Sequence, residues 1–361
     1  MNMLVTDIRA DRPTKEDAAA ALKTLMAHLK DHPEAATSLD LDALKALGYR
    51  AELNRTYPAD FRVTESYKET LPDLQNGPES LIKGAHAPIQ HVGISNFALP
   101  LTYTAANGQP LLLETSVTGS VSLEASKKGI NMSRIMRSFY RFKDTPMNLE
   151  AIEAILQAYV DDLGSFDARL MLRLRYPMLK PSLRSGLEGY QYYNVAFEVI
   201  REGGSTTRVM HLDYVYSSTC PCSLELSEHA RQERGQIATP HSQRSVARVS
   251  VTVEQGQTLS VEELVARCQE AIVTETQVMV KREDEQAFAE LNGSNPIFVE
   301  DAARLMCEAL EQTSQVGDFR IVASHQESLH SHDAVSVLTR GETFSNTSID
   351  PHLFQSLIHV G

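Results

Sequence analysis

Residues 95–124 read SNFALPLTYTAANGQPLLLETSVTGSVSLE and contain the pattern that decides the fold. Apolar and polar side chains alternate on both sides of Asn107-Gly108, a dipeptide that is the strongest short signal for a β-hairpin turn. After this hairpin the periodicity predicts helices over 131–142 and 147–162 and then strands near 169–175 and 190–200. The order is therefore strand, strand, helix, helix, strand, strand, or ββααββ.

The same order returns after the Gly203-Gly204 turn. Strands are predicted near 206–218 and 245–254, a helix after the capping box of Ser260 and Glu263, a helix from Asn295-Pro296 to about Gln315, and strands near 318–325 and 333–340. No residue-level self-similarity accompanies the repeat. We therefore predict an α+β domain over residues 88–343, made of two units (88–202 and 203–343), with two antiparallel sheets that each carry a helix pair on one face.

The flanking segments differ in character. Residues 1–87 are predicted to form a helical and irregular extension, with a helix capped by Thr14 and Asp17 and a second short helix over 38–47. The stretch from 57 to 88 is rich in Pro and Gly and is predicted to be irregular. Residues 344–361 are predicted to be a C-terminal tail.

Composition excludes several classes of protein. The chain has 361 residues, 42% hydrophobic content and a formal net charge of −13, which on average repels nucleic acid and anionic lipid. No run of apolar residues reaches the length of a membrane span, and no charged-then-apolar leader begins the chain. The four cysteines include one close pair, so we expect a cytoplasmic protein without disulfides and with no nucleic-acid or membrane partner.

One segment is basic, although the net charge of the whole chain is negative. Residues 127–143 read KKGINMSRIMRSFYRFK and contain six basic residues and no acidic one. Arg134, Arg137 and Arg141 fall on one face of the predicted helix. Such a stripe forms a solvated helix face, a subunit contact or a site for an anionic ligand.

The residues with the clearest chemistry are Cys220 and Cys222, which follow a predicted strand. If that segment is extended, residues two apart point the same way, so both sulfurs face one pocket. His241 precedes the next strand, and pairing of the two strands brings Cys220 and His241 together at the open end of a hairpin. A thiolate, an imidazole and a carboxylate from KREDE at 281–285 suit Zn²⁺ or a related divalent ion, with a fourth position open for water.

Other interpretations of these residues remain open. The cysteines form a partly buried hydrophobic pair, a structural zinc site, or a nucleophile activated by His229, His241 or His330. In the same way, a carboxylate of Glu300-Asp301 either stabilises a helix N-terminus or accepts two hydrogen bonds from a guanine-like edge. Histidines 325, 330 and 332 are surface residues of a turn, or one of them is a general acid or base.

Five segments taken together resemble the prokaryote-specific type IB GTP cyclohydrolase I family. They are TCPCS at 219–223, PHSQRS at 240–245, KREDE at 281–285, NPIFVED at 295–301 and ESLHSH at 327–332. VGISN at 93–97 and KGINMSR at 128–134 resemble further family segments, and the resemblance covers about residues 88–343.

The resemblance implies a tunnelling fold assembled as a homotetramer, with active sites at subunit interfaces. It implies hydrolysis of GTP to 7,8-dihydroneopterin triphosphate and formate, the first step of tetrahydrofolate synthesis, and it leaves a role in deazaguanine synthesis open. Carried over by motif, the divalent metal (Zn, Mn or Fe) is bound by Cys220, His241 and Glu285. Glu300 anchors guanine, and His330 and Cys222 act in proton transfer. Basic residues meet the triphosphate, and our own assignment for them is Ser133, Arg134 and Arg244.

The sequence also departs from the family pattern. The spacing from Cys220 to His241 is longer than in compact members, with a charged insertion over 225–239, and Asn131 stands where a histidine is common. Two rival functions stay open at this point. One is an archaeal-type relative that releases a cyclic phosphate, and the other is a nucleotide- or metal-binding protein that does not catalyse the reaction.

Overall fold

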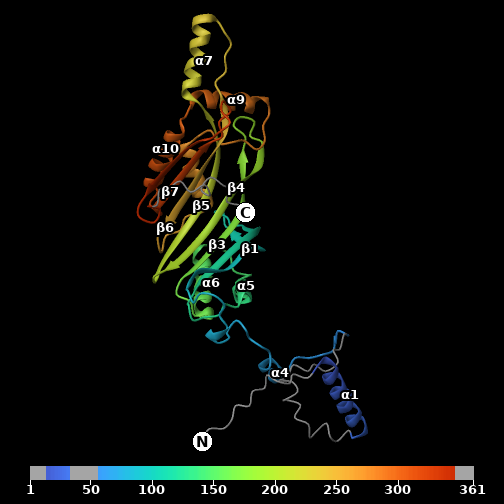
Figure 1. Ribbon diagram of the computed structural model, residues 1–361. Coiled ribbons are helices and arrows are strands. Elements are labelled where there is room, and N and C mark those ends of the chain that lie inside the picture. Colours follow the sequence, from blue (N-terminus) through green and yellow to red (C-terminus); the bar gives the residue numbers. More distant parts are fainter. Residues whose placement is uncertain (1–13, 33–55, 346–361) are drawn as a thin grey trace. The chain divides into compact units, whose positions relative to one another are not determined.

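The computed structural model describes residues 14–32 and 56–345, and the chain divides into two units at residue 72 (Figure 1). The first unit contains the helices α1 (Lys15–Asp31) and α4 (Glu65–Glu69). The predicted capping box is confirmed, because Thr14 Oγ1 accepts a hydrogen bond from Asp17 N (3.2 Å) and Asp17 Oδ2 accepts one from Thr14 N (2.9 Å). The helix predicted over 38–47 lies outside the described residues.

The second unit is built on one antiparallel sheet of eight strands. The prediction of two separate sheets is wrong, because β4 pairs with β5 and makes the two halves continuous. The strands are β1 (Ile89–Thr104), β2 (Pro110–Leu123), β3 (Ala168–Pro181), β4 (Glu188–Glu202), β5 (Ser205–Thr219), β6 (Ser242–Val253), β7 (Val316–His325) and β8 (Ala334–Arg340).

The turn that joins the two halves has only two residues. Gly203 and Gly204 have φ values of 57° and 86°. Positive φ at both central positions is the requirement of the tight hairpin turn that matches strand twist, and glycine adopts it without a steric penalty. The pair therefore fixes the register of β4 against β5.

Helices α5 (Met132–Arg141), α6 (Leu149–Leu163), α8 (Val261–Ala271) and α10 (Val299–Glu311) pack against one face of the sheet. Contacts join α5 and α6 to β1, β3 and β4, and join α8 and α10 to β5, β7 and β8. The buried row Leu172, Phe197, Met210, Val251 and Phe319 crosses five neighbouring strands on this face. The other helical elements described in this unit are the 3₁₀ turn η1 (Glu79–Leu81), α7 (Pro221–Arg234) and α9 (Arg282–Ser294).

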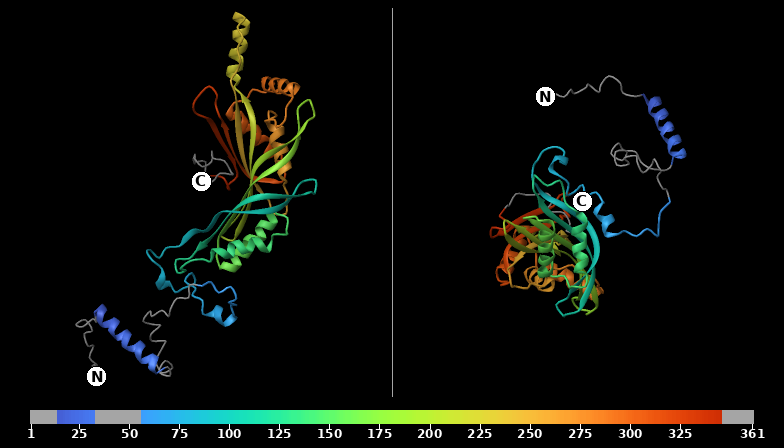
Figure 2. Two further views of the ribbon diagram at one scale, coloured as in Figure 1. Left: turned by 90° about the vertical axis from the view of Figure 1, so that its right-hand side faces the viewer. Right: turned by 90° about the horizontal axis from the view of Figure 1, so that it is seen from below.

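Most of the predicted elements are confirmed, and three differ. The helix predicted to begin at Asn295-Pro296 begins instead at Val299, and Asn295 is the C-cap of α9. Helix α9 itself was not predicted. The insertion after Cys220 is a helix, α7, which projects beyond the end of the sheet in two views (Figures 1 and 2). Among the described helices, none combines the length and the apolar composition needed to cross a bilayer.

The helix-free face of the sheet carries buried charges. Glu198 is hydrogen-bonded by Arg169 and by His211 Nε2 (3.0 Å), and His211 Nδ1 lies 2.8 Å from Ser250 Oγ. His211 is thus a packed residue of the sheet. Burial would raise the pKa of Glu198, but the hydrogen bond and charge of His211 and the charge of Arg169 outweigh it and lower this pKa to about 2.

Glu198→Gln is expected to lower the free energy of unfolding at neutral pH by about 3 kcal/mol, because it removes a buried carboxylate that accepts hydrogen bonds from Arg169 and from the buried His211. The folded-state pKa of about 2 lies below 4.5, the ordinary pKa of a glutamate carboxyl group, so the carboxylate stabilises the fold above pH 4.5 and loses this effect as the pH falls toward 2. Chemical unfolding at several pH values measures both effects. The exposed Glu202→Gln on the same strand is the control, and equal stabilities of the two variants would contradict the prediction.

Candidate active site

The open end of the β5–β6 hairpin brings Cys220 and His241 together, as the sequence predicts. Thr219 and Ser242 are the last paired residues of the two strands. Directly beyond them, Cys220 N donates a hydrogen bond to His241 O (3.2 Å), and His241 N donates one to Ser223 Oγ (3.1 Å). The backbone of His241 is therefore fixed to the first turn of α7, although 20 residues separate it from Cys220 in the chain.

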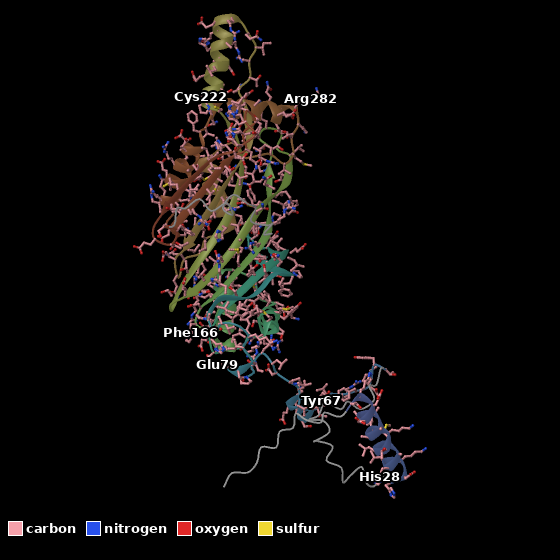
Figure 3. The ribbon with its side chains drawn as sticks, viewed as in Figure 1. His28, Tyr67, Glu79, Phe166, Cys222 and Arg282 are labelled. Carbon is pink, nitrogen blue, oxygen red and sulfur yellow. The ribbon has the colours of Figure 1, made fainter. Side chains whose placement is uncertain are left out.

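The expected extended geometry of the two cysteines is wrong. Cys220 is the N-cap of α7 and Pro221 occupies its first turn, where proline's missing N–H costs no hydrogen bond. Cys222 is therefore helical and exposed, whereas Cys220 is half-buried. Figure 3 shows Cys222 at the base of α7, at the end of the unit that also carries Arg282 at the start of α9.

The ring of His241 is engaged through Nδ1. This nitrogen lies 3.0 Å from Gln243 Oε1 and 3.4 Å from Glu327 Oε2. When the Nδ1–H of an imidazole is hydrogen-bonded to an oxygen acceptor, the lone pair of Nε2 is available to bind a metal ion. The thiol of Cys220 and the imidazole of His241 are a sulfur and nitrogen pair that suits a divalent transition metal.

Two carboxylates of the KREDE segment, Asp284 and Glu285, have different surroundings. Asp284 is buried and accepts hydrogen bonds from Ser185 N (2.8 Å) and Ser185 Oγ (2.6 Å), which fix the start of α9 to the β3–β4 turn. Burial would raise the pKa of Asp284, but these hydrogen bonds hold it well below its usual range. Glu285 is exposed and is free of this structural role.

Glu285 does not lie with the cysteine and histidine. Helix α9 touches this part of the structure through Asn292, whose Oδ1 is 3.5 Å from Thr219 Oγ1. Glu285 is seven residues earlier, about 10 Å along a helix axis. Within residues 14–32 and 56–345, no three His, Cys, Asp or Glu side chains are close enough together to hold a metal ion. The structure thus joins the backbones of Cys220 and His241 but does not bring Glu285 to them.

Glu300 lies in the first turn of α10 and is exposed, as expected for a ligand-facing carboxylate or a helix-terminal one. Ile297 N donates to Thr219 O (2.9 Å), so the segment before α10 is fixed to the residue preceding Cys220. His325, the last residue of β7, is buried, and its Nε2 lies 2.8 Å from Tyr216 Oη. Burial lowers the pKa of His325 to about 4, against the opposing effect of the nearby Glu300 charge.

His330 and His332 are exposed, and their rings stack with centroids 4.8 Å apart. Their turn is joined to β6, because Ser328 Oγ donates to Ser242 O (3.3 Å). His330 is therefore on a loop that reaches the strand beginning next to His241. Its exposure leaves it able to exchange protons with a ligand or with solvent.

The predicted triphosphate residues occupy two places. Arg134, Arg137 and Arg141 line a hollow of about 560 Å³ with Tyr140 and Asp162. Asp162 holds two of the arginines, through its O to Arg134 Nη1 (2.7 Å) and its Oδ2 to Arg141 Nη2 (2.5 Å). Ser133 begins the same helix. This helix, α5, and α7 lie at opposite ends of the unit in Figures 1 and 2.

Arg244 belongs to the other end. It is exposed on β6 opposite Ser217, and its neighbour Gln243 points to the opposite face of the sheet. Arg244 is therefore on the strand that begins next to His241, but on the other face of the sheet from Gln243. Ser133 and Arg134 are on α5, at the opposite end of the unit (Figure 1).

Several residues around His241 were not predicted. Gln243, Ser218 and Ser245 are buried polar side chains at strand positions that otherwise face the apolar core. The signal was present in the sequence, since Ser218 continues the period-two run of core-facing residues of β5 and Gln243 and Ser245 begin that of β6, each with a polar side chain. Gln243 also lies two residues after the predicted ligand His241. Glu327 is the first residue of the ESLHSH segment at 327–332, but no role was predicted for it.

Comparison with known proteins gives a consistent picture. A family model described as "Type I GTP cyclohydrolase folE2" matches residues 71–336. Proteins called "GTP cyclohydrolase FolE2" are similar over almost the whole chain. One from Roseobacter denitrificans is 61% identical over 357 residues (97% of each chain), and one from Cereibacter sphaeroides is 60% identical over 361 residues (100% of each chain).

The solved structures that match the chain have low sequence identity to it. Uricase from Arthrobacter globiformis matches with a TM-score of 0.42 and 7% identity, covering 71% of this chain and 94% of its own. A uricase described as from Bacillus fastidious matches with a TM-score of 0.42 and 8% identity, covering 72% and 98%.

Proposed function

The chain belongs to the type I GTP cyclohydrolase FolE2 family, which converts GTP to dihydroneopterin triphosphate in folate biosynthesis, and from this premise we propose how its residues divide the work. The observation that carries the proposal is the contact of Cys220 with His241 at the open end of the β5–β6 hairpin. This contact supports Cys220 and His241 as a sulfur and a nitrogen ligand, and the bond from Ile297 N to Thr219 O supports the nearness of the helix that carries Glu300.

Cys220 and His241 would hold one divalent metal ion (Zn, Mn or Fe), with Glu285 as the third ligand according to its motif. Bound there, the ion would supply the Lewis acidity that makes water a nucleophile near neutral pH. Since α9 carries Glu285 away from Cys220 in a single chain, the proposal includes completion of the ligand set when copies of the chain assemble. The KREDE carboxylates support this division, because Asp284 is fully used in holding α9 and Glu285 is exposed.

The remaining residues would bind and protonate the substrate. Glu300 accepts two parallel hydrogen bonds from the N–H groups of the guanine edge, an arrangement that selects this heterocycle. His330, exposed on its loop, transfers protons during opening and reclosure of the rings, and Cys222 at the base of α7 assists. Arg244 contacts the phosphates from the same chain.

Ser133 and Arg134 would meet the triphosphate from a second copy. They lie at the opposite end of the unit from α7, and a nucleotide held by Glu300 cannot reach both ends of one chain (Figure 2). We therefore propose a cytoplasmic homotetramer with active sites between subunits, each subunit being a tunnelling fold of two tandem ββααββ units. The placement of α5 and α6 on the first half of the sheet, and of α8 and α10 on the second, supports the tandem arrangement.

The function is tested by anaerobic incubation of the purified protein with GTP and Zn²⁺, Mn²⁺ or Fe²⁺ in turn. We expect release of formate together with a pterin triphosphate that becomes fluorescent on oxidation. A cyclic phosphate product, which the comparisons do not favour, would support the archaeal-type alternative. Binding of GTP without formate under every metal would support a non-catalytic protein.

A further inference from the structure

We infer that Gln243, held by the buried hydroxyl groups of Ser218 and Ser245, is a positioning residue that fixes the proton of His241 on Nδ1 and turns Nε2 toward the metal. The part of this inference that concerns the metal rests on the proposed function. The part that concerns the proton and the ring orientation rests on the geometry of the protein alone.

A continuous chain of hydrogen bonds starts at the imidazole. His241 Nδ1 is 3.0 Å from Gln243 Oε1, Gln243 Nε2 donates to Ser218 Oγ (2.7 Å), and Ser218 Oγ is 2.7 Å from Ser245 Oγ. Residues 241, 243 and 245 alternate onto the same side of β6, and Ser218 lies opposite Gln243 on β5. The pairing of two strands therefore builds the chain.

Burial makes this chain rigid. Ser218 and Ser245 are both fully buried, and the side chain of Gln243 is 8% exposed. Water cannot replace any of the hydrogen bonds at such positions, so each polar group depends on its protein partner. A glutamine is otherwise a flexible side chain, and the serine pair holds its amide in one place next to His241.

The order of donors and acceptors along these hydrogen bonds follows from the groups around His241 Nδ1. A glutamine amide has an acceptor oxygen and a donor nitrogen, so an oxygen facing Nδ1 requires a proton on that nitrogen. The opposite orientation of the amide would place its N–H₂ group against Nδ1. Glu327 decides between the two, because its Oε2 lies 3.4 Å from the same Nδ1 and a carboxylate only accepts. Two acceptors at Nδ1 leave Nε2 as the unprotonated nitrogen.

The decisive experiment is a long-range ¹H–¹⁵N spectrum of the metal-stripped, full-length protein labelled with ¹⁵N-histidine, recorded at about pH 8, where an ordinary imidazole is neutral. His241→Ala identifies the resonances of His241 by their loss. We expect the Nδ1–H tautomer in the unmutated protein. The Nε2–H tautomer, or an even mixture of both, would overturn the inference whatever the metal data show.

Metal affinity supplies the second readout, by competition of a chromophoric chelator for Zn²⁺. Gln243→Met keeps the size of the side chain but removes the acceptor, and we expect its affinity to fall about 10- to 100-fold, the usual effect of losing an outer partner of a ligating histidine. Gln243→Glu restores an acceptor and should recover most of the affinity. Ser242→Ala, on the same strand and exposed, is the control and should bind Zn²⁺ like the unmutated protein.

Unchanged affinity in Gln243→Met would overturn the positioning role. If His241→Ala itself keeps its metal, the proposed ligand set fails instead, while the tautomer of His241 still tests the hydrogen-bond chain. If Gln243→Met does not fold, Gln243→Glu and the spectrum of the unmutated protein decide the matter.

Discussion

Cys220→Ala and His241→Ala are each expected to lose bound metal and GTP turnover together. Each substitution removes one of the two proposed ligands at the open end of the β5–β6 hairpin, so the effect should exceed the roughly 10- to 100-fold loss that is typical of an outer partner. Metal content of the purified variants, measured by elemental analysis, and formate release from GTP are the two readouts. Activity should fall to the background of the assay.

Cys307→Ser is the matched control for this experiment. Cys307 is buried in α10, where its thiol donates to Glu311 Oε1 (3.5 Å), and a serine hydroxyl can keep that hydrogen bond. The control should retain metal and activity. If Cys220→Ala or His241→Ala retained one equivalent of metal after the same purification, the assignment of these two residues as ligands would be wrong.

Glu300→Gln is expected to reduce kcat/KM for GTP on the order of 10³-fold or more while the metal content stays the same. The substitution turns one acceptor oxygen into a donor that faces an N–H group of guanine, and sites built to hydrogen-bond a substrate discriminate at this scale. Steady-state kinetics with GTP, alongside elemental analysis, measures both quantities.

The neighbouring variant Asp301→Asn distinguishes a role of Glu300 in binding the substrate from a role in stabilising the helix. Both carboxylates lie in the first turn of α10, so each substitution removes a similar favourable interaction with the helix dipole. Asp301 is paired with Arg304 on the exposed side of the helix (2.7 Å), and its variant should keep near-normal kinetics. Equal kinetics of the two variants would show that Glu300 acts only on the helix.

The strands were predictable because their signals are local. The alternation on either side of Asn107-Gly108 fixes β1 and β2, and the glycine pair at 203–204 fixes the joint between β4 and β5. The prediction of two separate sheets missed the pairing of β4 with β5, although a two-residue Gly-Gly turn between strands is itself a hairpin signal. The predicted helix start at Asn295-Pro296 was wrong because of a contact between residues far apart in the chain. Ile297 N donates a hydrogen bond to Thr219 O, and the helix begins only at Val299.

The site was predictable to the extent that hairpin pairing decides it. Cys220 and His241 meet because the strands that end beside them are partners. The helical conformation of Cys222 was missed, although Pro221 is a signal for a first helical turn, because Cys220 provides no side-chain cap. The place of Glu285 depends on how α9 packs through Asn292 and Asp284, and those contacts join residues that are far apart in the chain.

The order of strands in the sheet bears on how the protein is made. Every strand from β2 to β8 pairs with the strand that precedes it in the chain. When a strand leaves the ribosome, its partner has therefore already been synthesised, and no strand has to be inserted later between two others. The sheet can therefore grow by addition at one edge during translation.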